Sequence, residues 1–468
     1  MLTDERAGDV LLVVLEQLFE PEEGLDALLD GAARPVLEGV AGGRDSLVDG
    51  RGASKGNCRE VLAGRGVGDR PGLVVGGLDP APADVVVDDL VCGSWFRTTT
   101  DQAERGAYFA PGFATDVRAR LGEAIAEVTP GSLSRTFFST SGTEAVEAAI
   151  KIARMHTGDQ KIVSRYRSYH GATYGSISVT GDPRRLEAEP GIPGTVKAPD
   201  PYAYGSTLDP MESLEYIDEM LMLEGDTVAA VLVEPIVGSN GILVPPAEYL
   251  PRLEEIAHDH GALLIADEVM SGFGRTGEWF GCDVFDVTPD IMTMAKGLSG
   301  AYVPLGATVV RDEIADHFED TMLCHGHTYA GHPVACAAGL AAVETYREQN
   351  LIDHASEVGS YLGDRLEALA ADHPSVGDVR GVGLFRGVEL TKDPRERVPF
   401  GTRADKISRG TTVVDEVTER AYENGVYVAN MINTLIIAPP LPITEADIDE
   451  AIAGLDDALT VADDAMVA

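Results

Sequence analysis

Basic side chains are scarce in this sequence of 468 residues. Lys and Arg number 36 against 77 Asp and Glu, which gives a formal net charge of −41 and an isoelectric point near 4.4. Such an acidic surface repels nucleic acid and anionic membranes, so neither is an expected partner. Because dissolved salt screens the repulsion between exposed carboxylates, we interpret the charge as a halophilic adaptation to a saline cytoplasm.

Cysteine is also rare, and long apolar runs are missing. The five cysteines form no CxxC pair and no regular spacing, which favours free thiols in a reducing compartment over a disulfide framework. No apolar run reaches the roughly 20 residues of a membrane-spanning helix. The apolar stretch at 11–15 is too short for a secretion signal and follows acidic residues. The expected location is therefore cytoplasmic.

The first hundred residues lack whole residue types. They contain no Ile, Tyr or His and a single lysine, Lys55. Few segments there keep a helical or strand period, so residues 1–100 are predicted to form an atypical N-terminal arm, divergent or partly disordered. A second hypothesis is a frame-shifted origin in a GC-rich gene, because the missing residue types have mainly AT-rich codons. An intact reading frame in the source gene would contradict it.

From Asp116 onward the pattern is α/β. Apolar residues recur at helical spacing over 117–128, and a short strand at 136–138 leads into a second helix. Further strands are unbroken apolar runs, which predict a mostly parallel sheet covered on both faces; they lie at 228–233, 262–266, 291–295 and 305–310. We expect a large domain over 101–334. A smaller α+β C-terminal domain over 335–468 would end in a capped helix at 444–459.

A turn rich in hydroxyl groups joins the strand at 136–138 to the helix that follows it. Ser141, Gly142 and Thr143 can cradle a phosphate, because glycine allows close backbone approach and the free amides at a helix start favour an anion. Taken alone, Ser and Thr at a helix start are more often simple N-caps.

Two charged residues end apolar strands. Asp267 follows 263–266, at the edge of the sheet where ligands of α/β proteins bind, and could hold a metal, act as a base or pair with a cationic ring nitrogen. The alternative is a helix cap or salt bridge. Lys296 follows 291–295, and a lysine desolvated there can become nucleophilic enough to form a Schiff base. The alternative is a lysine that reaches solvent.

With these elements in this order, the sequence resembles the class III aminotransferases, pyridoxal 5'-phosphate (PLP) enzymes of the aspartate aminotransferase fold, or fold type I. The resemblance runs from about Gln102 to the C-terminus. It rests on motifs at 141–145 (SGTEA), 169–171 (YHG), 233–236 (VEPI), 267–277 (DEVMSGFGRTG), 295–297 (AKG), 327–333 (HTYAGHP) and 380–383 (RGVG).

The resemblance implies catalytic roles for two residues. Lys296 would bind PLP as a Schiff base and then move the proton between substrate and cofactor carbons. Asp267 would keep the ring nitrogen of the cofactor protonated, which makes the ring an electron sink.

The resemblance also implies a set of binding residues. Tyr169 would stack on one face of the cofactor ring and Val269 would pack on the other. The phosphate would be held by Ser141, Gly142 and Thr143, and by Thr328 of a partner subunit, so a homodimer is expected. Arg380 would grip the α-carboxylate of the substrate. His170 and Glu234 complete the expected cofactor-binding set. No metal is expected, because His325, His327 and His332 match no common zinc spacing.

The residues after Glu234 narrow the expected class of amino donor. Relatives that act on 4-aminobutyrate or ornithine carry a glutamate at the position of Ser239, where it pairs with the substrate arginine. The segment from Gly238 to Pro246 resembles instead the ω-amino acid:pyruvate branch, such as β-alanine or taurine transaminases. Other class III activities remain open, including aminomutase, decarboxylase and racemase. So does a PLP-binding but catalytically impaired protein, because the N-terminal arm lacks the family's usual segment at the active-site mouth.

Overall fold

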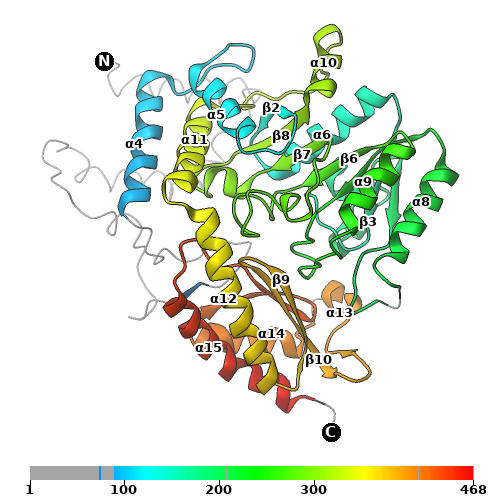
Figure 1. Ribbon diagram of the computed structural model, residues 1–468, viewed down its shortest axis with the longest axis vertical. Helices are drawn as coiled ribbons and strands as arrows, with labels where there is room; N and C mark the ends of the chain where they lie inside the picture. Colours follow the sequence, from blue (N-terminus) through cyan, green and yellow to red (C-terminus); the bar gives the residue numbers. More distant parts are fainter. Residues whose placement is uncertain (1–72, 75–88, 207, 409, 467–468) are drawn as a thin grey trace, which may run out of the picture. The chain divides into compact units, whose positions relative to one another are not determined.

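The computed structural model describes residues 73–74, 89–206, 208–408 and 410–466 (Figure 1). The chain divides into two compact units, Met1–Val67 and Gly68–Ala468, and all described residues belong to the second. Most of the predicted N-terminal arm, with its frame-shift hypothesis, lies outside the described residues. Its last part differs from the expectation of weak periodicity, because helix α4 (Asp89–Gly106) begins within it.

A seven-stranded sheet forms the centre of the larger part, in the order β2-β8-β7-β6-β5-β3-β4. Every pair in it is parallel except those of β8 with β7 and β2, so β8 alone runs against the rest. The predicted mostly parallel sheet is confirmed. Its strands are β2 (Leu133–Ser139), β3 (Lys161–Arg165), β4 (Thr195–Ala198), β5 (Val228–Val233), β6 (Leu263–Asp267), β7 (Ile291–Met294) and β8 (Gly306–Arg311).

Helices cover both faces of this sheet (Figure 1). Helix α6 (Gly142–Thr157) packs on one face in a cluster that includes Leu232. Helices α8 (Glu212–Glu224) and α9 (Tyr249–Asp259) pack on the other face with Val231 and Val233. Because successive side chains of a strand point to opposite faces, an unbroken apolar strand such as β5 is needed to fill both layers.

Further elements connect and flank these layers. The helices are α5 (Asp116–Ala126), α7 (Tyr174–Val179), α10 (Asp312–Asp320) and α11 (Pro333–Glu348), with 3-10 turns η3 (Pro183–Ala188), η4 (Asp283–Phe285) and η5 (Lys296–Ser299). None of the described helices is both long enough and apolar enough to cross a membrane.

The C-terminal part of the chain contains a second, antiparallel sheet of order β11-β10-β14-β13, with β9 beside β10. Its strands are β9 (Val376–Val382), β10 (Phe385–Asp393), β11 (Val398–Pro399), β13 (Ala429–Met431) and β14 (Thr434–Ile437), and a short pair joins β1 (Leu73–Val74) to β12 (Val426–Tyr427). The helices of this part are α12 (Leu351–Asp372), α13 (Arg403–Ser408), α14 (Val413–Glu423) and α15 (Glu445–Asp464). The predicted domain boundary at 334/335 falls in the first turn of α11 and stays a prediction.

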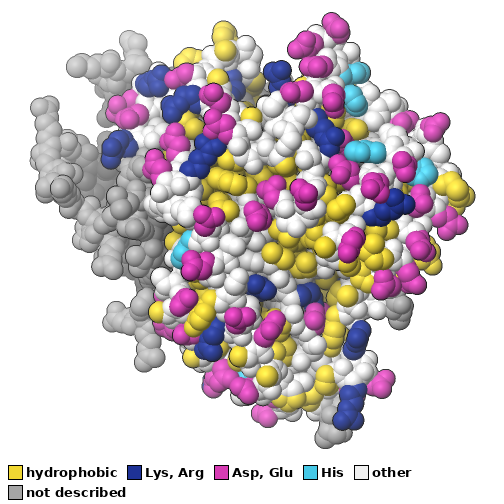
Figure 2. Space-filling model, viewed as in Figure 1, with side chains coloured by type: hydrophobic (Ala, Val, Ile, Leu, Met, Phe, Trp, Pro, Cys, Tyr) yellow, Lys and Arg dark blue, Asp and Glu magenta, His cyan; other side chains and the backbone are white. Residues whose placement is uncertain are grey.

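The final helix begins where its sequence indicates. The Thr444 side chain accepts a hydrogen bond from the Asp447 amide, and the Asp447 side chain accepts one from the Thr444 amide, which is a capping box. The helix extends to Asp464, beyond the predicted end at 459. Figure 2 shows acidic side chains spread over the visible face, as the composition requires.

Candidate active site

Asp267 and Lys296 come from neighbouring strands of the central sheet. Strand β6 ends at Asp267 and pairs in parallel with β7, so that Asp267 lies opposite Thr293. The turn η5 begins at Lys296, two residues after the end of β7. The carboxyl ends of parallel strands meet at one edge, and the two residues predicted to be catalytic therefore lie at the same edge of the sheet.

Three donors hold the buried Asp267 carboxylate. Its Oδ2 lies 2.7 Å from Nδ1 of His170, and its Oδ1 accepts hydrogen bonds of 3.1 Å from the Val269 amide and from the Thr293 hydroxyl. His170 is itself buried, and its Nε2 has no hydrogen-bond partner among the described residues. A buried carboxylate this well supported keeps a fixed orientation, which suits a group that must face a cationic ring nitrogen.

The backbone of Lys296 adopts φ +39°, which is uncommon for a residue other than glycine. The side chain is accessible to solvent, yet protein surrounds the ammonium on most sides. This burial lowers the pKa of Lys296, while Asp267 and Glu234 act in the opposite direction. A backbone held in a strained conformation together with a desolvated amine marks a functional position.

The predicted phosphate cradle forms the start of α6. Ser141 is the N-cap and accepts a hydrogen bond from the Glu144 amide. The Thr143 hydroxyl is contacted by the amides of Ala172 and Thr173 at 3.2 and 3.1 Å. The neighbouring Gly171 has φ +132°, and a Cβ there would lie 2.3 Å from the Thr143 Oγ1. A second loop therefore closes tightly on the helix start and leaves room for glycine only.

Close packing also explains Gly142 at the same turn. A Cβ at Gly142 would meet both methyl groups of Val269 at 3.0 Å. Val269 is thereby placed against the start of α6, on the same side of the molecule as the cradle. The sequence-predicted residues Gly142, Thr143, Val269, Asp267 and His170 thus form one connected group.

Glu234 orients the loop around Tyr169. Its two oxygens accept hydrogen bonds from the backbone amides of Tyr169 at 3.0 Å and Gly238 at 2.8 Å. Burial raises the pKa of Glu234, and Asp267 acts in the same direction. The Tyr169 ring lies 3.9 Å from the Arg184 guanidinium, a cation–π contact. The contacts of Glu234 within the chain hold the backbone of Tyr169, and its predicted role in binding the cofactor stays a prediction.

Arg380 is held by two acidic side chains of its own sheet. Its Nη1 lies 2.6 Å from Oδ2 of Asp378 and 2.7 Å from Oε2 of Glu389. In the β9–β10 register Asp378 lies opposite Glu389, so that one arginine forms ion pairs with two facing acids. Arg380 also donates to the carbonyl oxygens of Gly241 and Ile242. Burial lowers the pKa of Arg380, but Glu389 and Asp378 outweigh it and raise the pKa.

The His327 ring lies 3.8 Å from the Glu144 carboxylate in the first turn of α6, and Thr328 follows His327 directly. Thr328 is exposed on the loop between α10 and α11, and its carbonyl accepts a hydrogen bond of 2.9 Å from the Tyr108 hydroxyl. Nearby, the His325 ring packs 5.0 Å from the ring of Phe137. Within the described ranges no cluster of His, Cys, Asp or Glu side chains is arranged to hold a metal.

Comparisons with known proteins agree with this geometry. The sequence model of the Aminotransferase class-III family matches residues 97–459. The chain belongs to this family.

Individual relatives of this class III aminotransferase are similar over most of its length. A putrescine–pyruvate aminotransferase of Pseudomonas aeruginosa is 38% identical over 71% of this chain and 74% of its own. A taurine–pyruvate aminotransferase of Bilophila wadsworthia is 37% identical over 75% of this chain and 81% of its own. The crystal structure of taurine:2-oxoglutarate aminotransferase from Bifidobacterium kashiwanohense, in complex with PLP and glutamate, superimposes with a TM-score of 0.76. It is 36% identical and covers 81% of this chain and 88% of its own.

The fold type I assignment is therefore confirmed, and the chain is a PLP-dependent aminotransferase. The residues present fit this cofactor. The turn at Ser141–Thr143 closes as a glycine-bearing cradle of the kind that binds phosphate, while Lys296 offers a desolvated amine and Asp267 a buried carboxylate. When bound, PLP supplies the electron-withdrawing ring and the carbonyl group that carries the amino group between substrates.

Sequence reasoning missed several residues of the site of this class III aminotransferase. Thr293 supports Asp267, and it is the one polar residue inside the apolar strand β7, a signal that could have been used. Glu389 gives no such signal, because only the pairing of β9 with β10 brings it to Arg380. Tyr202 gives none either, because it contacts Glu389 and Arg380 from the distant loop between β4 and α8.

Proposed function

We propose that this enzyme transfers an amino group from an ω-amino acid or amine to pyruvate or a similar small keto acid. The observation that carries the proposal is the charge balance at Arg380. Because Asp378 and Glu389 already form ion pairs with Arg380, a donor without an α-carboxylate leaves this arginine with its charged partners in place. The putrescine–pyruvate and taurine–pyruvate relatives support a donor of this kind and pyruvate as the acceptor.

The residues of the chain then divide the work. Lys296, with its lowered pKa, would act as the base and acid that moves a proton at the substrate carbon. Asp267, fixed by His170 and Thr293, would hold the ring nitrogen of the cofactor in its protonated form. Arg380 would bind the α-carboxylate of the keto acid after the Glu389 carboxylate has been displaced from its ion pair with Arg380.

Product analysis tests the proposal directly. Holoenzyme in high salt is given pyruvate with β-alanine, taurine or putrescine in turn, and the alanine formed is quantified by chromatography. Alanine formation that matches donor consumption, and that disappears in the Lys296→Ala variant, is the expected result. A donor that is isomerised, decarboxylated or racemised while pyruvate stays unchanged would overturn it. If PLP is bound but no tested donor reacts, the result would support the alternative of a protein that binds PLP but is catalytically impaired.

We also propose that the active enzyme is a homodimer in which Thr328 serves the site of the partner subunit. Its exposed position on the loop between α10 and α11 supports this, because an exposed side chain can contact a neighbouring subunit. A subunit with Lys296→Ala and a subunit with Thr328→Ala each lack a different part of the site. If Thr328 acts across the interface, refolding the two together restores one intact site per dimer and regains activity. Mixing without any gain would show that Thr328 acts in its own subunit or not at all.

The acidic surface supports a third proposal, that the protein works in a saline cytoplasm. Exposed carboxylates repel one another, and salt screens that repulsion. We expect the midpoint of thermal unfolding to rise steeply as KCl is raised from millimolar to molar levels. A midpoint independent of salt would contradict the halophilic interpretation.

A further inference from the structure

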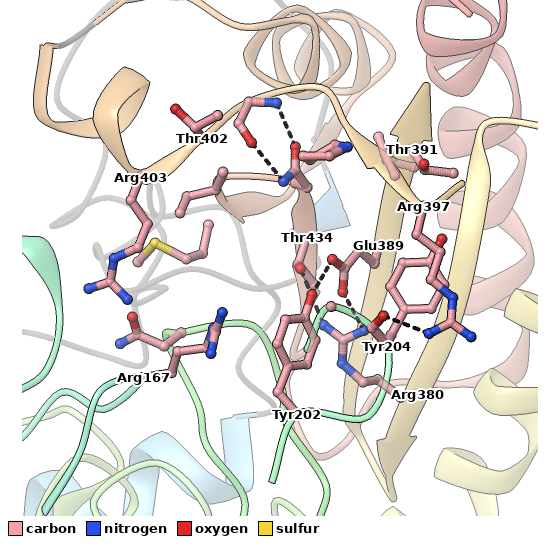
Figure 3. A pocket seen from close by; sticks show the side chains of 18 of the residues that line it. Arg167, Tyr202, Tyr204, Arg380, Glu389, Thr391, Arg397, Thr402, Arg403 and Thr434 are labelled. Carbon is pink, nitrogen blue, oxygen red and sulfur yellow. Dashed lines mark hydrogen bonds and ion pairs between the residues drawn. The ribbon is translucent and has the colours of Figure 1, made fainter. Parts of the chain in front are cut away.

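One cavity in the described part of the chain is lined by more basic than acidic side chains, although the chain as a whole is strongly acidic. It has a volume of about 220 Å³, and its lining includes Arg167, Arg380, Arg397 and Arg403 but a single acidic residue, Glu389 (Figure 3). The whole chain, in contrast, carries 77 acidic and 36 basic side chains. Four arginines in one cavity of so acidic a protein indicate a site for anions.

Arg167 and Arg403 lie on one side of this cavity and Arg397 on the other (Figure 3). Arg167 binds Asp200 through Nη1 at 2.9 Å, which leaves Nη2 and Nε without a hydrogen bond to any described residue. Arg403 donates to the carbonyl oxygens of Tyr166 and Gly181, and no carboxylate in the described ranges lies within ion-pair distance of it. Burial lowers the pKa of Arg403 and the positive charge of Arg167 lowers it further, whereas the more distant Asp182 and Asp200 act in the opposite direction. The two guanidinium groups thus share one ion-paired carboxylate, that of Asp200, and Arg403 itself has none within ion-pair distance among the described residues.

Asn240 supplies an independent observation. It lines the same cavity, is only 8% exposed, and its Nδ2 has no hydrogen-bond partner among the described residues. A buried amide donor without a partner is unfavourable, so it calls for a ligand atom that accepts. Two guanidinium groups and one amide N–H form a donor set suited to a carboxylate or sulfonate.

The adjacent residue connects this donor set to Arg380. The carbonyl oxygen of Gly241 accepts hydrogen bonds from Nε and Nη2 of Arg380, and Asn240 precedes Gly241 directly. Arg380 lines the same cavity. A small ligand with an acidic group at each end would therefore find a receptor for both groups within one cavity.

We propose that Arg167, Arg403 and Asn240 form a second anion site, which binds the distal carboxylate or sulfonate of a substrate whose α-carboxylate is held by Arg380. The inference rests on the proposed role of Arg380 in binding the keto acid. It adds short dicarboxylic keto acids, and acids with a terminal sulfonate, to the substrate class of the enzyme.

Unreactive acids test the site without turnover. Propionate carries one carboxylate and glutarate two, and calorimetry on the holoenzyme gives the dissociation constant of each. We expect glutarate to bind about tenfold more tightly than propionate, and Arg403→Gln to remove that advantage while propionate binding stays unchanged. Arg403→Lys keeps the positive charge but cannot form the bidentate hydrogen bonds of a guanidinium, so it should retain part of the preference for glutarate. Arg252→Gln, an exposed arginine of α9, makes the same change in charge elsewhere and should have no effect.

Competition by sulfate shows which end of the cavity binds an isolated anion. Sulfate that competes with glutarate but not with propionate would support the site, because it would occupy the Arg167–Arg403 end alone. Equal binding of glutarate and propionate in the native enzyme would overturn the substrate role, even if sulfate binds. The same holds if Arg403→Gln, shown to be folded by its unfolding temperature, keeps the preference for glutarate. Absent transamination with an intact glutarate preference would refute the proposed function and leave the second site standing.

Discussion

Replacing Glu389 by Gln removes the negative charge beside Arg380 and keeps the size and shape of the side chain. Oε2 of Glu389 lies 2.7 Å from Nη1 of Arg380, although no hydrogen bond reaches it, and the Tyr202 hydroxyl donates to Oε1. In the proposed mode of binding, a keto acid displaces this carboxylate before its own can bind Arg380. The variant should therefore bind monocarboxylates more tightly than the native enzyme.

The size of the effect follows from the contacts that remain. A hydrogen bond or ion pair to a charged group contributes about 1.5–3 kcal/mol, and about 1.4 kcal/mol corresponds to a tenfold change in affinity. Arg380 keeps Asp378 and two backbone carbonyl partners in the variant, so we expect the lower end of the range. The KM for pyruvate and the dissociation constant of propionate should each fall about tenfold, with kcat for the amine donor little changed.

Asp378→Asn is the matched control. It also removes a carboxylate from Arg380, but its side chain is 30% exposed against 8% for Glu389, so solvent screens it more strongly. Its effect on KM should be several times smaller. A pyruvate KM that is unchanged or raised in Glu389→Gln would refute the reasoning, because it would show that Glu389 positions Arg380 for the substrate instead of competing with it.

Three further predictions concern the cofactor site and stability. Lys296→Ala should abolish turnover and covalent retention of PLP, checked by dialysis and mass spectrometry; PLP that stays covalently bound would contradict the role of Lys296. Gly171→Ala should destabilise the fold by roughly 1–3 kcal/mol and weaken PLP binding, because its Cβ would meet Thr143 at φ +132°, whereas Gly112→Ala, in open space, should change neither. Burial lowers the pKa of Lys197 from its ordinary value of 10.5 to about 7. Between these two pH values the unfolded chain keeps a proton that the folded protein has lost. The free energy of unfolding therefore increases by up to about 1.4 kcal/mol per pH unit as the pH rises above 7. Lys197→Met should remove this slope in urea titrations at pH 7 and 9, and parallel slopes in the two proteins would contradict it.

The sequence by itself determined the elements whose signal is local. Helix caps, apolar strands and the residues at strand ends depend on neighbours a few positions away, so the start of α6, the end of β6 at Asp267 and the position of Lys296 could be predicted. Their convergence followed from one general rule, that parallel strands end at a common edge.

Tertiary structure alone decided what surrounds those residues. Arg380 and Glu389 meet because β9 and β10 pair in one particular register, and a shift of one residue would send the two side chains to opposite faces. His170 reaches Asp267 across 97 positions of sequence, and Arg403 joins the cavity from a short helix far along the chain. Such contacts depend on how separate elements pack, and residue types at a given spacing do not encode that packing locally. The family and the chemistry could thus be predicted from the chain, whereas the ion pairs around Arg380, on which the proposed choice of substrate rests, required the folded protein.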